Sequence, residues 1–179
     1  MKLSNEDAQL FYDLWFPLLD YLNEKYMVNP YIGKITGVEN VNPAEVSVIA
    51  EFLWEKPELI DEYLSENKLS EENQKIVAGW KRRKTGRFVL ERNLKKGSIF
   101  ISEDNKVYLI QGLFSSFEEM FRMHPLPVMM DMTIIPFKDK IITDGLIKAM
   151  PLIFGSNFKS DLKECYMSAK KSGKIHNTI

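Results

Sequence analysis

A run of basic residues between positions 81 and 96 carries the clearest chemistry in the sequence. Eight of these residues are Lys or Arg and one, Glu91, is acidic, in a chain whose formal net charge is -1. Cations gathered on one face would contact phosphates and release counterions. The candidate nucleic-acid contacts are Arg82, Arg83, Lys84, Arg87, Lys95 and Lys96. Neighbouring aromatic rings (Trp80, Phe88 and Phe100) would supply stacking platforms for bases.

The same basic strip also has a structural explanation. Its first four charges would lie in the last turn of a helix, where cations meet the negative end of the helix dipole. Lys95 and Lys96 have the composition of a turn. The sequence pI of about 6.2 is far below the value above ~9 that is typical of basic nucleic-acid modules. Solvated or internally paired charges are therefore the leading interpretation, and nucleic acid or a protein partner are the alternatives.

Three aspartates near one predicted hairpin are the candidate acid–base groups. Asp139 lies in a turn and a glycine follows Asp144, so both are typical turn residues. Asp131 falls in the middle of a predicted strand, and an ion pair with Arg87 or Arg92 across the sheet explains it better than catalysis. An enzyme with a carboxylate site around Asp131 and Asp144 stays an alternative.

No metal or cofactor is expected from the sequence. It contains two histidines, His124 and His176, and one cysteine, Cys165, without the spacing of metal ligands. It also lacks a phosphate-binding P-loop, a G-x-G-x-x-G segment and a G-x-S-x-G nucleophile elbow. Catalysis is accordingly the less favoured interpretation.

The elements that must position these residues change type near residue 84. Start signals at Asn42-Pro43 and Ser70, with apolar residues at helical spacing, predict four helices before it. Strands are predicted at 88–94, 99–101, 107–110, 126–137 and 141–143, helices at 115–122 and 157–171, and an edge strand in 174–179. We therefore expect an α+β fold: N-terminal helices, then a mainly antiparallel sheet of about five strands with two further helices.

Charge follows this division. Residues 1–80 sum to -9, residues 81–96 to +7 and residues 97–179 to +1. We expect an acidic helical segment over 1–69 and an α+β domain over 70–179. An exposed aromatic face of the first helix, formed by Phe11, Trp15 and Phe16, is the candidate surface for a protein partner or self-association.

Three segments give the sequence a resemblance to a family of bacterial proteins. They read ENQKIVAGWKRRKTGRFVLERNLKKGSIFI, KVYLIQGLFSSFEEMF and LPVMMDMTIIPFKDKIITDGL. The shared features are a helix ending in Trp, a Gly-aromatic strand, a basic turn before an apolar strand, and a Pro-Phe-Lys, Ile-Ile, Asp-Gly hairpin. The resemblance covers roughly residues 70–172 and implies a fold unit in a bacterial cytoplasm. It implies no activity or catalytic residue, and the Cys/His metal segment of some relatives is missing here.

Composition completes the expectation. With 45% hydrophobic and 12% aromatic residues the chain can bury a core, and a single cysteine excludes an internal disulfide framework. Neither a signal peptide nor a run of about 18 apolar residues is seen, so a cytoplasmic protein without a membrane partner is expected. The leading function is a non-enzymatic binding or accessory protein, with nucleic-acid binding by the basic strip as the first alternative.

Overall fold

The chain forms two compact units in the computed structural model, which describes residues 1–38 and 41–179. The helical unit is Glu6–Lys81, and the barrel unit combines Met1–Asn5 with Arg82–Ile179. The boundary therefore falls after Lys81 and not after residue 69. The reason is Trp80, whose ring packs edge-to-face on those of Phe11 and Trp15, with centroids 5.7 and 5.6 Å apart.

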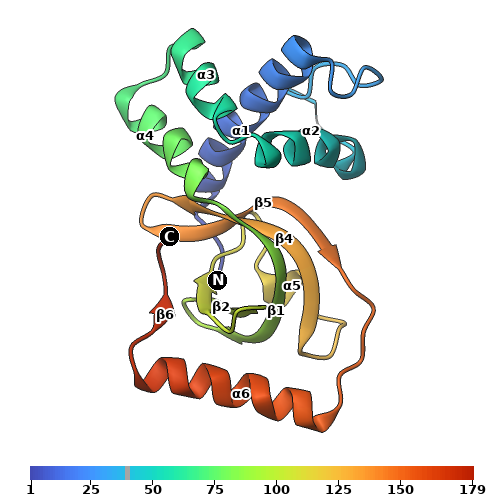
Figure 1. Ribbon diagram of the computed structural model, residues 1–179, viewed down its shortest axis with the longest axis vertical. Helices are drawn as coiled ribbons and strands as arrows, with labels where there is room; N and C mark the ends of the chain where they lie inside the picture. Colours follow the sequence, from blue (N-terminus) through green and yellow to red (C-terminus); the bar gives the residue numbers. More distant parts are fainter. Residues whose placement is uncertain (39–40) are drawn as a thin grey trace. The chain divides into compact units, whose positions relative to one another are not determined.

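The helical unit contains the four helices that the sequence predicts. They are α1 (Asn5–Tyr26), α2 (Pro43–Glu55), α3 (Leu59–Glu66) and α4 (Glu71–Gly79), followed by a 3-10 turn at Trp80–Arg82 (Figure 1). Two of the predicted caps are present. Asn42 accepts a hydrogen bond from the Ala44 N–H at 3.1 Å, and Ser70 accepts one from the Asn73 N–H at 3.3 Å.

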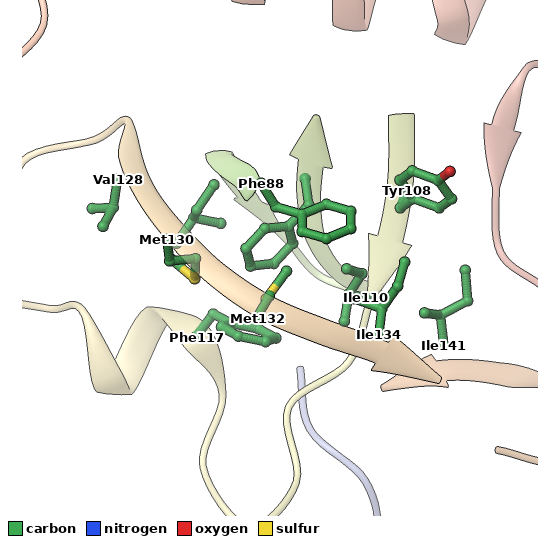
Figure 2. Packing of buried hydrophobic residues seen from close by; sticks show 11 residues of the cluster. Phe88, Tyr108, Ile110, Phe117, Val128, Met130, Met132, Ile134 and Ile141 are labelled. Atoms are coloured by element: carbon green, nitrogen blue, oxygen red, sulfur yellow. The ribbon is translucent and has the colours of Figure 1, made fainter. Parts of the chain in front are cut away.

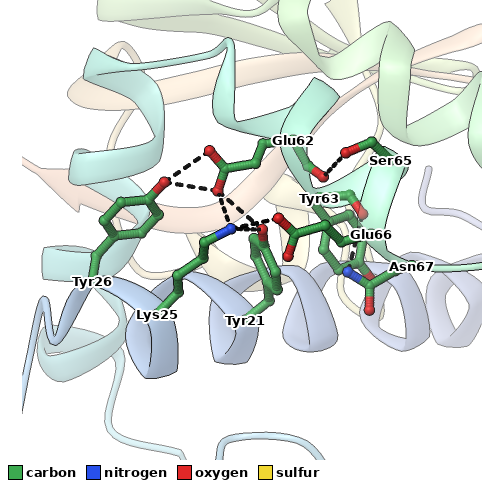
Figure 3. A network of polar contacts seen from close by, with 8 residues as sticks. All are labelled: Tyr21, Lys25, Tyr26, Glu62, Tyr63, Ser65, Glu66 and Asn67. Carbon is green, nitrogen blue, oxygen red and sulfur yellow. Dashed lines mark hydrogen bonds and ion pairs between the residues drawn. The ribbon is translucent and has the colours of Figure 1, made fainter.

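A polar network joins α1 to α3 in this unit (Figure 3). The hydroxyls of Tyr21 and Tyr26 donate to Glu62 at 3.0 and 2.7 Å, and the Lys25 ammonium contacts Glu62 at 2.9 Å and Glu66 at 2.6 Å. Burial is the main cause that raises the pKa of Tyr21 to about 12. The pKa of Glu62 is lowered, chiefly by the hydrogen bond from Tyr26. The network therefore holds both carboxylates charged at neutral pH.

The barrel unit is built from six strands and two helices (Figure 1). The strands are β1 (Lys84–Leu94), β2 (Gly97–Ser102), β3 (Val107–Ile110), β4 (Val128–Phe137), β5 (Lys140–Ala149) and β6 (Ile175–His176). The helices are α5 (Phe117–Met120) and α6 (Ser156–Lys171). Among the residues that the structure describes, no helix is both long and apolar enough to cross a membrane.

Five of the strands close into a ring. The order is β2-β1-β4-β5-β3, and β3 pairs back onto β2. All pairings in the ring are antiparallel except β3 with β5, which are parallel at Ile110 and Ile141. This order, with a helix between the third and fourth strands, is that of the five-stranded OB-fold barrel. The α+β class and the mainly antiparallel sheet are confirmed, and β6 adds a sixth strand parallel to β3.

Alternate residues of the strands fill the inside of the barrel (Figure 2). As the sequence predicts, Val128, Met130, Met132 and Ile134 of β4 share this face. Phe117 of α5 packs on Phe100 with ring centroids 4.7 Å apart. The helix α5 thereby contributes a large apolar side chain to the barrel core.

The intervening residues of the first three strands point outward and are covered by α6. Leu162 and Tyr166 of α6 pack in one cluster with an apolar set from β1, β2 and β3, namely Val89, Ile99, Ile101 and Val107. The Arg92 guanidinium lies over the Tyr166 ring, 4.2 Å from its centroid. The outer face of these strands is therefore a second core and not an open surface.

Candidate nucleic-acid interface

The structure divides the basic strip into two groups at opposite ends of β1. Arg82, Arg83 and Lys84 lie before or at the start of the strand, and Lys95 and Lys96 follow its end. Eleven extended residues correspond to about 35 Å of chain. The predicted contacts therefore do not form one cluster.

The two arginines between these groups are occupied by acidic partners. Arg87 Nε donates to Asp131 Oδ1 at 3.1 Å, and Arg87 also lies 3.9 Å from Glu103. Arg92 forms an ion pair with Glu91 and stacks on the Tyr166 ring of α6. Both arginines thus have structural roles within the barrel unit.

Lys95 and Lys96 occupy the turn between β1 and β2. Both side chains are exposed, and within the described part of the chain neither makes an ion pair. Gly97 follows them with a φ of +151°, and a Cβ added there would lie 2.8 Å from the Ile110 carbonyl oxygen. Glycine is required because the turn passes directly over the end of β3.

Gln111 connects this turn to the one between β4 and β5. Its side-chain Nε2 donates to the Lys96 carbonyl oxygen at 3.4 Å, and its backbone N–H donates to the Ile141 carbonyl oxygen at 3.0 Å. Ile141 is the second residue of β5, directly after Lys140, and Lys138 lies in the turn between β4 and β5. The two turns, with Gln111 between them, form what we call the basic end of the barrel.

Lys138 and Lys140 were not among the predicted contacts. The sequence does predict a turn at these residues, but local sequence pattern does not show which other turns lie beside it in the fold. They join Lys96 only because β3 pairs with β5 in parallel, through Ile110 and Ile141. Lys140, whose side chain is half-buried, contacts the exposed Asp139 at 3.0 Å, and an ion pair near the surface contributes little to stability. The basic end therefore contributes four lysines.

The two candidate catalytic carboxylates have separate surroundings. Asp131 is the partner of Arg87, as the structural interpretation predicts. Asp144 is buried, and its Oδ1 accepts a hydrogen bond from the Leu146 N–H at 3.0 Å. That contact, two residues along the chain, is typical of a turn-forming aspartate.

The histidines and the cysteine are also placed apart from one another. His176 lies 5.2 Å from the Tyr108 ring, and His124 lies 5.8 Å from the Phe121 ring. Cys165 donates to the Asn105 carbonyl oxygen at 3.5 Å, and burial raises the pKa of its thiol. Within residues 1–38 and 41–179, no three His, Cys, Asp or Glu side chains are grouped so as to hold a metal ion.

The aromatic face of the first helix is inside the helical unit. Phe11 is 0% exposed and Trp15 is 1% exposed, and Trp15 stacks on Trp54 with ring centroids 5.3 Å apart. Phe16 is half-buried beside Tyr12, at a centroid distance of 5.0 Å. The expected exposed patch is therefore absent at Phe11 and Trp15, because α2 and the end of α4 supply aromatic rings that cover them.

Comparison with known proteins returned no match: no family model, no curated protein and no solved structure is similar to the chain. The resemblance to a bacterial family stays an expectation.

Proposed function

We propose that this protein is a nucleic-acid-binding protein without catalytic activity, and that its barrel unit binds backbone phosphates at the basic end. The observation that carries the proposal is the double contact of Gln111, which brings the Lys95–Lys96 turn beside the Lys138–Lys140 turn. Lysines on two neighbouring turns suit successive phosphates of one strand better than they suit a single carboxylate.

The charge of the separate units supports the same proposal. The barrel unit contains 18 Lys and Arg against 10 Asp and Glu, a net charge of +8. The helical unit contains 6 against 15, a net charge of -9. The low pI of the whole chain therefore reflects the helical unit, and it does not argue against a basic module in the barrel unit.

A comparison with other barrels of the same strand order gives the proposal weaker support. Barrels with this strand order commonly bind oligonucleotides with the loops between the first and second and between the fourth and fifth strands. Those are the two loops that form the basic end. The strand face that such barrels also use is covered here by α6, so the proposed site is confined to the loops.

The test is fluorescence anisotropy with mixed-sequence single- and double-stranded DNA and RNA at salt concentrations from about 25 to about 300 mM. We expect a dissociation constant in the micromolar range at low salt, and a logarithmic affinity that falls linearly with the logarithm of salt concentration. Absence of binding at the lowest salt, or binding that salt does not weaken, would refute the proposal.

A further inference from the structure

We infer that the helical unit binds a partner protein that carries a basic surface, through an exposed apolar patch centred on Tyr31. This patch, which we call the Tyr31 surface, is formed by the end of α1, the connector that follows it and one side of α2. Its exposed members are Tyr26, Met27, Tyr31 and Val48. The inference goes beyond nucleic-acid binding, because it concerns the other unit of the chain and does not depend on the basic end.

The turn that carries Tyr31 is held by the side chain of Asn23. The Asn23 amide oxygen accepts a hydrogen bond from the Asn29 N–H at 2.7 Å, and its amide nitrogen donates to the Asn29 carbonyl oxygen at 3.1 Å. The Tyr31 N–H donates in turn to Asn29 Oδ1 at 3.2 Å. These bonds fix the backbone of Tyr31, while its side chain is 95% exposed. A tyrosine held in this way offers a large contact area at a low cost in conformational entropy, as binding hot spots do.

Met27, two residues before Asn29, has a backbone conformation that methionine rarely adopts. Its φ is +50°, and its N–H donates to the Asn23 carbonyl oxygen at 2.9 Å at the end of α1. Glycine is the usual residue at a left-handed helix end, because a side chain is strained there. Here the position instead presents a thioether that is 66% exposed. A flexible methionine suits a surface that adapts to a partner.

Contacts between α1, the connector and α2 make the patch continuous. Asn29 Nδ2 donates to the Glu45 carbonyl oxygen at 3.5 Å, which brings the Tyr31 turn to the first turn of α2. Val48 lies three residues further along α2 and is 44% exposed, and Phe52 follows four residues later on the same helix face. The Phe52 ring lies against the Tyr26 ring, with centroids 5.5 Å apart. The three segments therefore contribute to one surface.

The charges on these segments are mainly acidic. Their exposed glutamates are Glu24, Glu45, Glu51 and Glu55. Their cations are Lys25, which contacts Glu62 and Glu66, the exposed Lys34, and Lys56, whose ammonium lies 4.4 Å from the Phe52 ring centroid. The helical unit as a whole has a net charge of -9.

This charge decides which class of partner fits the Tyr31 surface. Nucleic acids and anionic lipids would meet an excess of charge of their own sign, and so would a second Tyr31 surface from another copy of the chain. A protein with an apolar pocket rimmed by Lys and Arg has the complementary charge, which speeds its association and excludes acidic competitors.

The test uses a phage-displayed library of random twelve-residue peptides as the probe. The library is selected on the full chain at about 150 mM salt, where long-range charge attraction is partly screened, and phage that also bind Tyr31→Ser are removed. We expect the recovered peptides to combine an aromatic or aliphatic anchor with an excess of Lys and Arg.

Peptides synthesised from the recovered sequences then measure the contribution of the ring. Tyr31→Ser should weaken their binding about 10-fold or more, and Tyr31→Phe, which keeps the ring, should bind as the unaltered chain does. Met123→Ser removes an 88% exposed apolar side chain from the barrel unit and is the control that should change nothing. Lys95→Ala/Lys96→Ala should also leave peptide binding unchanged, so failure of this inference is distinguishable from failure of the phosphate site.

Three outcomes would overturn the inference. Peptides that bind the unaltered chain and Tyr31→Ser equally, or no enrichment at all, would exclude this surface from binding. Recovered peptides that depend on Tyr31 but carry no excess of Lys and Arg would refute the basic partner. Self-association of the chain in sedimentation velocity, abolished by Tyr31→Ser, would show that a second copy covers the surface instead.

Discussion

Arg87 and Asp131 face each other across the antiparallel β1–β4 pair, and Arg87 Nε donates to Asp131 Oδ1 at 3.1 Å. This contact accounts for an acidic residue in the middle of a strand whose alternate residues fill the barrel. It also gives one arginine of the basic strip an acidic partner. One cross-strand pair thus provides a structural explanation for both a candidate catalytic acid and a candidate phosphate ligand.

The pair should contribute modestly to stability. Both side chains are about 40% exposed, so a double-mutant cycle of Arg87→Ala and Asp131→Ala should give a coupling free energy of about 0.2 to 1 kcal/mol. All three tryptophans lie in the helical unit, so urea unfolding of the barrel is best followed by NMR of barrel amides. A coupling free energy of zero within error would show that the contact does not stabilise the fold.

Gly97→Ala should be among the more damaging single changes in the barrel. Its Cβ would approach the Ile110 carbonyl oxygen at 2.8 Å, and its φ of +151° is one that residues with side chains rarely adopt. We expect a loss of about 1 to 3 kcal/mol in unfolding free energy. Gly33→Ala, which meets no atom within 4 Å, is the control and should stay within about 0.5 kcal/mol. Equal effects would contradict the close approach of this turn to β3.

The carboxyl group of Asp104, in the turn between β2 and β3, should make the stability of the barrel unit depend on pH. Hydrogen bonds from Lys106 and Ser102 lower the pKa of Asp104 from its ordinary value of 3.8 to about 2. A lowered folded-state pKa means that the charged carboxylate stabilises the fold above about pH 4, and that this contribution disappears as the pH falls toward 2. Because the pair with Lys106 is about half exposed, the contribution should be below about 1 kcal/mol.

Asp104→Asn should therefore lower the stability of the barrel slightly at pH 7, and the difference should be much smaller at pH 2, where about half of the carboxyl groups are protonated. Urea unfolding at the two pH values measures the difference, and an NMR titration of the Asp104 carboxyl group should have its midpoint near 2. A midpoint at the ordinary value of 3.8 would show that the turn does not hold the carboxylate as described.

Gln111→Ala tests whether the Gln111 side chain holds the two basic turns together. It removes the side-chain donor to the Lys96 carbonyl oxygen and keeps the backbone bond to Ile141. The loss of one hydrogen bond should weaken nucleic-acid binding about two- to fivefold. Because glutamine is uncharged, the salt slope should not change. A reduced slope would mean that the substitution displaces whole lysine side chains, and unchanged affinity would mean that the tie does not position the site.

Local pattern was sufficient for much of this fold. Alternation along β4 predicted which residues face the core, and the mid-strand position of Asp131 predicted its arginine partner. The helix caps at Asn42 and Ser70 were read from residue type alone. The helix caps depend only on residues close in sequence. The partner of Asp131 depends on the pairing of two strands, but the alternation of apolar and polar residues already shows which face of each strand is polar.

The closure of the barrel could not be predicted from local sequence pattern. The parallel contact of Ile110 with Ile141 joins positions 31 residues apart and depends on the register of the whole ring. Without it, nothing indicates that Lys140 neighbours Lys96. The burial of Phe11 and Trp15 was missed for a related reason: helical spacing shows that they share a face, but only tertiary packing shows that Trp54 and Trp80 cover it.

The most direct test of the proposed phosphate site compares Lys95→Ala/Lys96→Ala with Lys170→Ala/Lys171→Ala. Both double variants remove two exposed lysines from the barrel unit, the first at the basic end and the second at the end of α6. With single-stranded DNA, the first should reduce the salt slope by about 1.4 units and the second should leave it unchanged. Equal losses for both variants would contradict a localised site, and an unchanged slope for Lys95→Ala/Lys96→Ala would exclude this turn from phosphate binding.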